Sequence, residues 1–356
     1  MAPAAERDPR WLDTLAERAR DRLPASVLEY VLQGARDSLT AGEAVAAWRA
    51  VRLLPRVLHD VTQVETSVSL LGHPAQVPWG VAPSTLQRAV HPDGELAMAR
   101  ACAAAGSVMV VSSNAGTAFS EIGGTGVHWW LQAYLPADRT LAGPMLDRAV
   151  AAGARAVVLT VDTPVVGTKY ASPGTALVWE TVDPALLRVN FEPGYDEQPG
   201  AEKALDLGPH DIGWVAARTG LPVVVKGVLR PEDALRCAQA GAGAVWVSNH
   251  GGRQLDRSAS TAACLPDVVD AVGDQAEVYV DGGLRTGLDV VAALALGARA
   301  VFLGRSPLLA LLDGAEGVAR LHQELLEQTV ETLRLAGCRT PADAPGLAAG
   351  GRLTPR

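Results

Sequence analysis

From about residue 76 onward the chain repeats one pattern of apolar and small residues: an alanine-rich stretch, a glycine, and then a short apolar run. Ala101–Gly106 and Ala151–Gly153, for example, precede the apolar runs Val108–Ser112 and Ala156–Val161. A glycine after a helix supplies a left-handed cap, and a continuous apolar run is typical of a strand buried on both faces. Helices that alternate with buried strands predict a parallel sheet.

Eight apolar runs qualify as strands, and eight strands with intervening helices predict a (β/α)8 TIM barrel. The predicted strands are Pro78–Ala82, Val108–Ser112, His128–Ala133, Ala156–Val161, Pro222–Lys226, Ala244–Ser248, Glu277–Asp281 and Ala300–Gly304. The chain has 356 residues, which suits a single barrel domain with extensions, since such domains commonly take about 250 residues or more. A doubly wound open sheet is the alternative that the pattern leaves open.

Residues 1–75 form an N-terminal helical segment in this interpretation, with helices predicted at Trp11–Arg22, Ser26–Gly34 and Ala41–Val51. Pro24 separates the first two helices, because proline disfavours the helical conformation of the residue before it. We expect the segment to pack on the N-terminal end or the mouth of the barrel.

The barrel is assigned to residues 76–340, and one of its connections is unusually long. Gly167–Pro209 follows the fourth strand and contains several Pro-Gly turns. A loop of that length at the C-terminal face of a barrel predicts a lid over the active site. Near the end, Gly314–Gly337 has helical periodicity, and we expect residues 341–356 to be a loose tail.

The composition excludes several classes of partner. With 31 Lys+Arg against 39 Asp+Glu the net charge is −8, which disfavours binding to nucleic acid or to an anionic membrane. The four cysteines form no CxxC pair, so neither a metal site nor a disulfide framework is expected. The first residues lack the apolar core of a secretory signal, no apolar run approaches 20 residues, and the last residues are no peroxisomal signal. We therefore expect a cytoplasmic protein.

Polar residues collect directly after the predicted strands, where barrel enzymes carry their active sites. Ala82–Thr85, Ser112–Asn114, Gln132–Tyr134, Thr160–Asp162, Lys226, Ser248–Arg253, Asp281–Arg285 and Gly304-Arg305 occupy these ends. The beginnings of the strands carry nothing comparable. The asymmetry predicts an active site at the C-terminal face.

Two clusters in this set indicate particular chemistry. Glycines beside Arg285 and Arg305, after the seventh and eighth strands, are typical of a phosphate site. His250 stands three residues before Arg253, which combines a base that works near neutral pH with a guanidinium that can bind a carboxylate.

The chain resembles the FMN-dependent 2-hydroxy acid oxidase and dehydrogenase family, which includes glycolate oxidases, lactate oxidases and mandelate dehydrogenases, over about residues 20–340. The family motif Ser-Asn-His-Gly-Gly-Arg-Gln-Leu-Asp is complete at Ser248–Asp256. Leu159–Pro164, Lys226–Val228 and Asp281–Gly283 agree in order and spacing. The resemblance implies FMN as cofactor, a 2-hydroxy acid as substrate, O2 as the electron acceptor that becomes hydrogen peroxide, and a homotetramer.

The resemblance also implies roles for single residues. His250 would take the proton of the substrate hydroxyl while the C2 hydrogen moves as hydride to flavin N5, and Asp162 would pair with the resulting imidazolium. Arg253 would hold the substrate carboxylate, and Tyr30 and Tyr134 would hydrogen-bond to the carboxylate and the hydroxyl. By the pattern alone, an aromatic residue in the helical stretch around Tyr30 is more often a core residue.

The expected FMN contacts come from the strand ends. Lys226 would stabilise the negative charge of the reduced ring. Ala82, Pro83, Ser84, Ser112, Gln132, Thr160 and Ser248 would contact the isoalloxazine, and Asp281, Gly283, Arg285, Gly304 and Arg305 the ribityl phosphate.

Several positions depart from the family pattern. Lys169 stands where relatives usually have a second carboxylate-binding arginine, and it keeps the charge but not the bidentate geometry. Asn114 replaces a bulky residue and implies a more polar substrate pocket, and Thr85 replaces the usual Ala or Gly near flavin N5. Lysine occurs only at Lys169, Lys203 and Lys226, and the other 28 basic residues are arginine, so each lysine is expected to serve its own chemistry.

Three alternatives remain open on the sequence. The same scaffold could oxidise an amine or a natural-product intermediate, as the three departures permit. An isomerase of the isopentenyl diphosphate type shares the fold, although the intact Ser248–Arg253 motif argues against it. A flavin-binding protein without catalysis is the third, and His250→Ala separates it from the enzymes.

Overall fold

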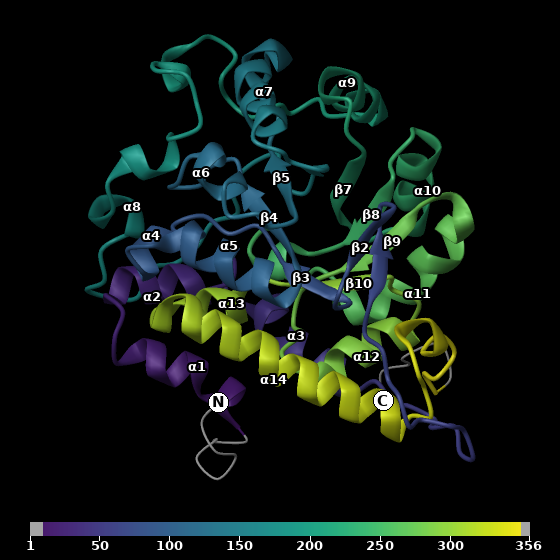
Figure 1. The fold of residues 1–356 in the computed structure, drawn as a ribbon. Coiled ribbons are helices and arrows are strands. Elements are labelled where there is room, and N and C mark those ends of the chain that lie inside the picture. Colours follow the sequence, from purple (N-terminus) through teal and green to yellow (C-terminus); the bar gives the residue numbers. More distant parts are fainter. Residues whose placement is uncertain (1–9, 350–356) are drawn as a thin grey trace.

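The computed structural model describes residues 10–349 and has at its centre a closed barrel of eight parallel strands (Figure 1). The strands follow one another around the barrel in chain order, and the pairing of Val301 in β10 with Trp79 in β3 closes it. The closure excludes the doubly wound sheet and confirms the predicted TIM barrel. The strands are β3 (Trp79–Val81), β4 (Val108–Ser112), β5 (Trp129–Ala133), β6 (Val157–Thr160), β7 (Val223–Val228), β8 (Ala244–Val247), β9 (Glu277–Val280) and β10 (Ala300–Leu303).

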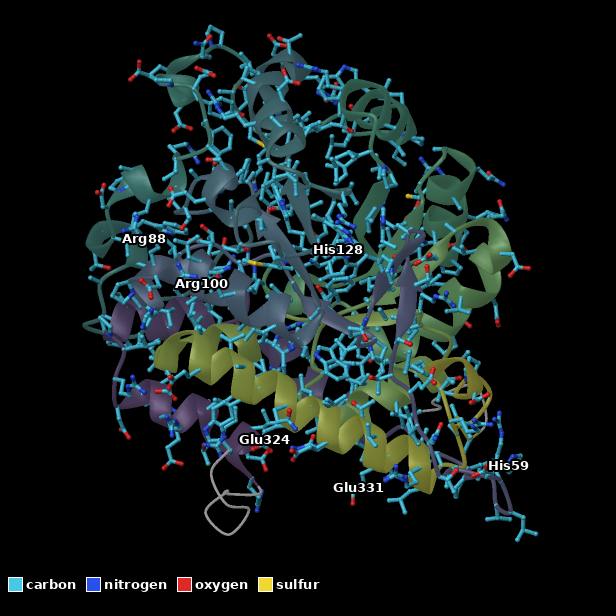
Figure 2. All side chains as sticks on the ribbon, in the orientation of Figure 1. His59, Arg88, Arg100, His128, Glu324 and Glu331 are labelled. Carbon is cyan, nitrogen blue, oxygen red and sulfur yellow. The ribbon has the colours of Figure 1, made fainter. Side chains whose placement is uncertain are left out.

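Helices surround the strands (Figure 1). They are α4 (Gln87–Val90), α5 (Gly94–Ala105), α6 (Phe119–Gly123), α7 (Gly143–Ala151), α9 (Pro209–Thr219), α10 (Pro231–Gln239), α11 (Thr261–Val272), α12 (Gly287–Ala295), α13 (Arg305–Ala310) and α14 (Gly314–Leu335). The predicted C-terminal helix is confirmed by α14. Leu321, Leu325 and Leu333 bury one of its faces, while Glu331 projects from it (Figure 2).

Large aromatic side chains fill the inside of the barrel. Trp130, Trp246, Tyr279 and Phe302 are buried there, and the ring centroids of Trp246 and Phe302 are 4.1 Å apart. A barrel with eight strands is just wide enough for such side chains to fill it. The interior is therefore a packed core, and a ligand site has to lie beyond the ends of the strands.

A short antiparallel hairpin closes the N-terminal end of the barrel, and the sequence analysis did not predict it. Its strands are β1 (Val68–Leu70) and β2 (His73–Ala75). Leu70 packs into the barrel core, and the backbone N–H of Leu71 donates to Glu277 at the start of β9 over 3.0 Å. Strands of three residues are too short to show an alternating pattern of apolar and polar residues, which is why the sequence did not reveal them. The segment up to residue 75, which was expected to be helical, therefore also contains a hairpin.

The three N-terminal helices lie at the opposite end of the barrel, at its mouth. They are α1 (Trp11–Arg20), α2 (Ala25–Leu32) and α3 (Leu39–Arg49). Trp48 in α3 donates to the backbone oxygen of Gly282 after β9 over 2.7 Å, and Arg253 after β8 donates to that of Tyr30 in α2 over 2.6 Å. The segment was expected to pack either on the N-terminal end of the barrel or on its mouth, and in the structure its helices pack on the mouth.

The long connection between β6 and α9 packs against α2. It contains α8 (Val178–Thr181) and the short 3-10 helices η3 (Pro184–Leu187) and η4 (Tyr195–Glu197). Figure 1 shows α8 beside α2. The rings of Trp179 and Tyr30 meet edge to face at 5.3 Å, and the hydroxyls of Thr181 and Ser26 are 3.0 Å apart. The connection thus reaches the mouth of the barrel.

The described part of the C-terminal segment is not loose. Pro341, Ala344 and Leu347 are buried, and the backbone N–H of Leu54 donates to the oxygen of Leu347 over 2.7 Å. The expected loose tail is therefore wrong for residues 341–349, because these apolar side chains pack on the barrel. Residues 350–356 of the expected tail, and residues 1–9 of the N-terminal segment, lie outside the described part. In residues 10–349 no helix is both long enough and apolar enough to span a membrane.

Candidate active site

A cavity of about 560 Å³ opens at the C-terminal ends of the strands, between the barrel and the N-terminal helices. Most of the predicted site residues line it: Tyr30, Ala82, Pro83, Ser84, Ser112, Asn114, Gln132, Tyr134, Thr160, Lys169, Lys226, His250, Arg253, Asp281, Gly283, Arg285, Gly304 and Arg305. Asp162 and Ser248 do not line it, but each bonds to a residue that does. The structure thus brings residues from both halves of the chain together.

His250 and Asp162 form a hydrogen-bonded pair. Nδ1 of His250 lies 2.9 Å from Oδ1 of Asp162, and the side chains are 22% and 13% exposed. Because the carboxylate accepts the Nδ1 proton, the other ring nitrogen, Nε2, is left as a base. Burial lowers the pKa of His250 below its ordinary value even though Asp162 opposes the shift. Burial would raise the pKa of Asp162, but His250 and Lys226 outweigh it and lower that pKa. The pair therefore rests as neutral imidazole and carboxylate near neutral pH.

The backbone around this pair is shaped to hold it. His250 has a φ of +57°, an uncommon conformation for a residue with a side chain, and its N–H donates to Oγ of Ser248 over 3.1 Å. Gly227 forms an irregularity in β7, with a φ of +109°. A Cβ at Gly227 would lie 2.6 Å from the Asp162 side chain, so the glycine makes room for the carboxylate. Strain of this kind clusters at functional sites.

Lys226 is a buried cation with two partners. Its Nζ donates to Oγ of Ser248 over 2.8 Å and lies 3.1 Å from Oδ2 of Asp281. The side chains of Lys226 and Asp281 are 4% and 9% exposed. A buried charge needs such partners, since burial of an unpaired ion is costly. Lys226 therefore brings an ammonium group, held by Asp281 and Ser248, into the lining of the cavity.

Three arginines concentrate further positive charge along one side. Burial and the neighbouring charges of Arg285 and Arg253 together lower the pKa of Arg305 to about 9. Burial also lowers the pKa of Arg285. Mutual repulsion of this kind is relieved when an anion binds between the guanidinium groups.

Comparison with known proteins agrees with this arrangement. Residues 19–347 match the family described as FMN-dependent dehydrogenase. The chain belongs to that family. A glycolate oxidase from Arabidopsis thaliana is 38% identical over 333 residues, covering 90% of each chain. An L-lactate oxidase from a Nostoc species is 37% identical over 339 residues, covering 90% of this chain and 92% of the relative. A crystal structure of mandelate oxidase with benzoyl-formic acid has a TM-score of 0.85 at 36% identity, covering 96% of this chain and 99% of that one.

The cavity suits the FMN of an FMN-dependent dehydrogenase. Nε2 of Gln132, Oγ1 of Thr160 and Oδ1 of Asp281 are buried polar atoms with no hydrogen-bond partner within residues 10–349, and all three residues line the cavity. Buried polar groups normally have partners. A flavin ring carries the carbonyl and N–H groups that could supply them, and the arginine cluster suits the phosphate. The residues present therefore fit this cofactor.

Tyr30 and Arg253 lie together in the cavity lining. Nη1 of Arg253 donates to the backbone oxygens of Tyr30 and Gln33, and its guanidinium lies 4.7 Å from the Tyr30 ring centroid. Burial raises the pKa of Tyr30, so its hydroxyl stays protonated as a donor. Tyr30 is thus a cavity residue, although it also packs against the core.

The three departures from the family pattern all line the cavity. Nζ of Lys169 donates to the backbone oxygens of Gly167 and Arg253 over 2.7 and 2.8 Å. Oδ1 of Asn114 accepts from Arg188 in the lid over 3.3 Å, and the Thr85 hydroxyl donates to the backbone oxygen of Asn114 over 2.7 Å. Asn114 therefore makes the pocket polar and joins it to the lid.

Lys203 and Trp179 are among the cavity residues that were absent from the predicted set. Lys203 and Trp179 both come from the lid, whose path over the barrel no sequence pattern fixes. Lys203 carried a signal, because it is one of only three lysines in the chain. Trp179 carried none that separates it from a core aromatic.

Proposed function

We propose that the protein oxidises a 2-hydroxy acid to the 2-oxo acid, with FMN as cofactor and with O2 as the final acceptor that leaves as hydrogen peroxide. The His250–Asp162 pair carries the proposal, because it supplies a neutral base in the same cavity as Arg253. The oxidase names of the relatives support this choice of substrate class and acceptor.

The residues of this chain divide the reaction as follows. Arg253 binds the substrate carboxylate, helped by the hydroxyls of Tyr30 and Tyr134. Nε2 of His250 takes the proton of the C2 hydroxyl, and Asp162 stabilises the imidazolium through the hydrogen bond at Nδ1. FMN, when bound, supplies a two-electron acceptor for the C2 hydrogen and passes the electrons to O2. The balance is one proton to His250 and two electrons with the C2 hydrogen to the cofactor.

The proposed FMN contacts are assigned from the charges and hydrogen-bonding groups of the residues that line the cavity. Lys226 offers a positive charge to the reduced ring, at a place where Asp281 and Ser248 hold it. Arg285 and Arg305 bind the phosphate. The remaining ring contacts are assigned to Ala82, Pro83, Ser84, Ser112, Gln132, Thr160 and Ser248, and further phosphate contacts to Gly283 and Gly304.

We also propose that the protein is a cytoplasmic homotetramer. All four cysteines are free thiols, which suits a reducing compartment. One Arabidopsis thaliana relative, 37% identical, is named as a peroxisomal (S)-2-hydroxyacid oxidase, so fractionation of the source cells has to decide the compartment. Light scattering should give a mass of about four times the 37.0 kDa of one chain.

The test of the activity is anaerobic reduction of the flavin. The purified protein should show a flavin absorption band, and glycolate, lactate, mandelate or 4-hydroxymandelate should bleach it without oxygen. Air should then restore the band and release hydrogen peroxide. His250→Ala should keep the bound flavin and lose the bleaching. A flavin band that none of these acids bleaches would contradict the proposed substrate class, and bleaching by the His250→Ala variant at the parent rate would remove His250 from the reaction.

A further inference from the structure

Lys203 places an ammonium group in the wall of the cavity without an acidic partner of its own. A β-bridge between Lys203 and Pro136 fixes its backbone at the end of the lid. Its Nζ lies 3.9 Å from the centroid of the Tyr134 ring, and the side chain is half-buried. Among the described residues no carboxylate lies within salt-bridge distance of this Nζ. Lys203 thus faces the site with its charge unneutralised.

The same part of the wall holds more positive than negative charge. Arg253 and Lys203 both lie close enough to Lys169 to act on it, and burial together with the charges of Arg253 and Lys203 lowers the pKa of Lys169 to about 8. Asp162 is the acidic group close enough to act on Lys203. Asp162 is already paired with His250 over 2.9 Å. A substrate with one carboxylate would neutralise the charge at Arg253 and leave a further cation facing it.

The use of lysine at this position is unusual for the chain. Only three of its 31 basic residues are lysines, and all three line this one cavity. Lysine is a compact point charge, whereas arginine is a wide planar fork. An ammonium group in the cavity wall, lying against the Tyr134 ring, suits a small anionic group of the substrate.

We propose that Lys203 binds a second carboxylate of the substrate, so that the preferred substrates are 2-hydroxydicarboxylates; this rests on the proposed function. Arg253 binds the carboxylate next to the reacting carbon, and Lys203 binds the one at the far end of the chain. A carboxylate is a compact anion, and Lys203 lines the same cavity as Arg253. Lys203 acts as a specificity-determining residue and takes no part in the proton transfer.

The test compares acids that differ only at the far end. Malate, 2-hydroxyglutarate and 2-hydroxyadipate are each paired with the monocarboxylate of equal chain length: 2-hydroxybutanoate, 2-hydroxypentanoate and 2-hydroxyhexanoate. The readout is kcat/KM from flavin reduction, together with the Kd of the corresponding 2-oxo acids from the flavin difference spectrum. In at least one pair the dicarboxylate should be preferred about tenfold or more, in both kcat/KM and Kd.

Two variants test whether Lys203 causes the preference for dicarboxylates. Lys203→Met should lower the dicarboxylate-to-monocarboxylate ratio at least tenfold, and Lys203→Arg should retain most of it because the charge remains. A role confined to supporting the Tyr134 ring would change both acids of a pair equally, and an unchanged ratio in Lys203→Met would overturn the proposal.

Flavin reduction in the unmodified protein tests the proposal even without the variants. If monocarboxylates reduce the flavin as well as or better than dicarboxylates in every pair, the second-carboxylate proposal is wrong while the proposed function stands. If none of these acids reduces the flavin, and glycolate, lactate and mandelate also fail, both are wrong.

Discussion

Replacing Asp162 with asparagine tests how much the carboxylate behind His250 contributes to proton transfer. Asparagine has nearly the same shape and can still accept the Nδ1 hydrogen bond, so the change removes mainly the negative charge. That charge is 2.9 Å from the ring nitrogen, and both side chains are largely shielded from solvent. The imidazolium that forms in the reaction should therefore lose most of its stabilisation.

The magnitude follows from Coulomb's law. Two charges about 4 Å apart interact by about 4 kcal/mol at an effective dielectric constant of about 20. Partial exposure of the pair screens part of this, so we expect a loss of about 2–4 kcal/mol in the transition state. Since each 1.36 kcal/mol is about tenfold in rate, flavin reduction should slow by about 30-fold to 1,000-fold.

The assay is stopped-flow flavin reduction without oxygen, using the acid that reduces the parent protein fastest. Asp256→Asn is the matched control, because Asp256 caps α3 through the N–H of Thr40 and lies outside the cavity lining. The control should react within about threefold of the parent. If Asp162→Asn retains its flavin and also reacts within threefold of the parent, the carboxylate does not support the base and the reasoning fails.

Three further predictions follow from the charges of the site and the core. Burial lowers the pKa of His250, so the acid limb of the pH profile of kcat/KM should lie below pH 6.5. Because Asp162 opposes that shift, Asp162→Asn should move the acid limb to lower pH, and a move to higher pH would contradict the assignment of His250 as the base. Lys226→Met leaves the buried Asp281 without its cation, so the free energy of unfolding of the FMN-free protein should fall by about 3 kcal/mol in a urea titration. A loss under about 1 kcal/mol would contradict the importance of the Lys226–Asp281 pair for stability. His322 has its pKa lowered by burial from 6.5 to about 4, so the folded state resists its protonation. Its contribution to stability should therefore fall by about 2 kcal/mol between pH 7 and pH 5, and His322→Gln should flatten the pH dependence measured by urea titration.

The strand ends explain why so much of the site is predictable from the sequence. His250 and Asp162 are 88 residues apart in the chain, but each follows an apolar run, and parallel strands bring such positions to one face. The long connection before α9 follows no such rule, since the position of Lys203 depends on its bridge to Pro136, far away in the sequence. The hairpin at the foot of the barrel was missed for a similar reason: Leu70 is held by contacts with the barrel core rather than by a local pattern.

The arginines of the site face the cavity and also hold the backbone of the N-terminal segment. Arg253 and Arg305 both line the cavity, yet each also donates to backbone oxygens at the end of α2 and just beyond it, Arg253 to Tyr30 and Arg305 to Val31. A guanidinium has five N–H donors in a fixed plane, so it can hold the helix with one edge and present another to an anion. Each of these two side chains therefore links α2 directly to the lining of the cavity.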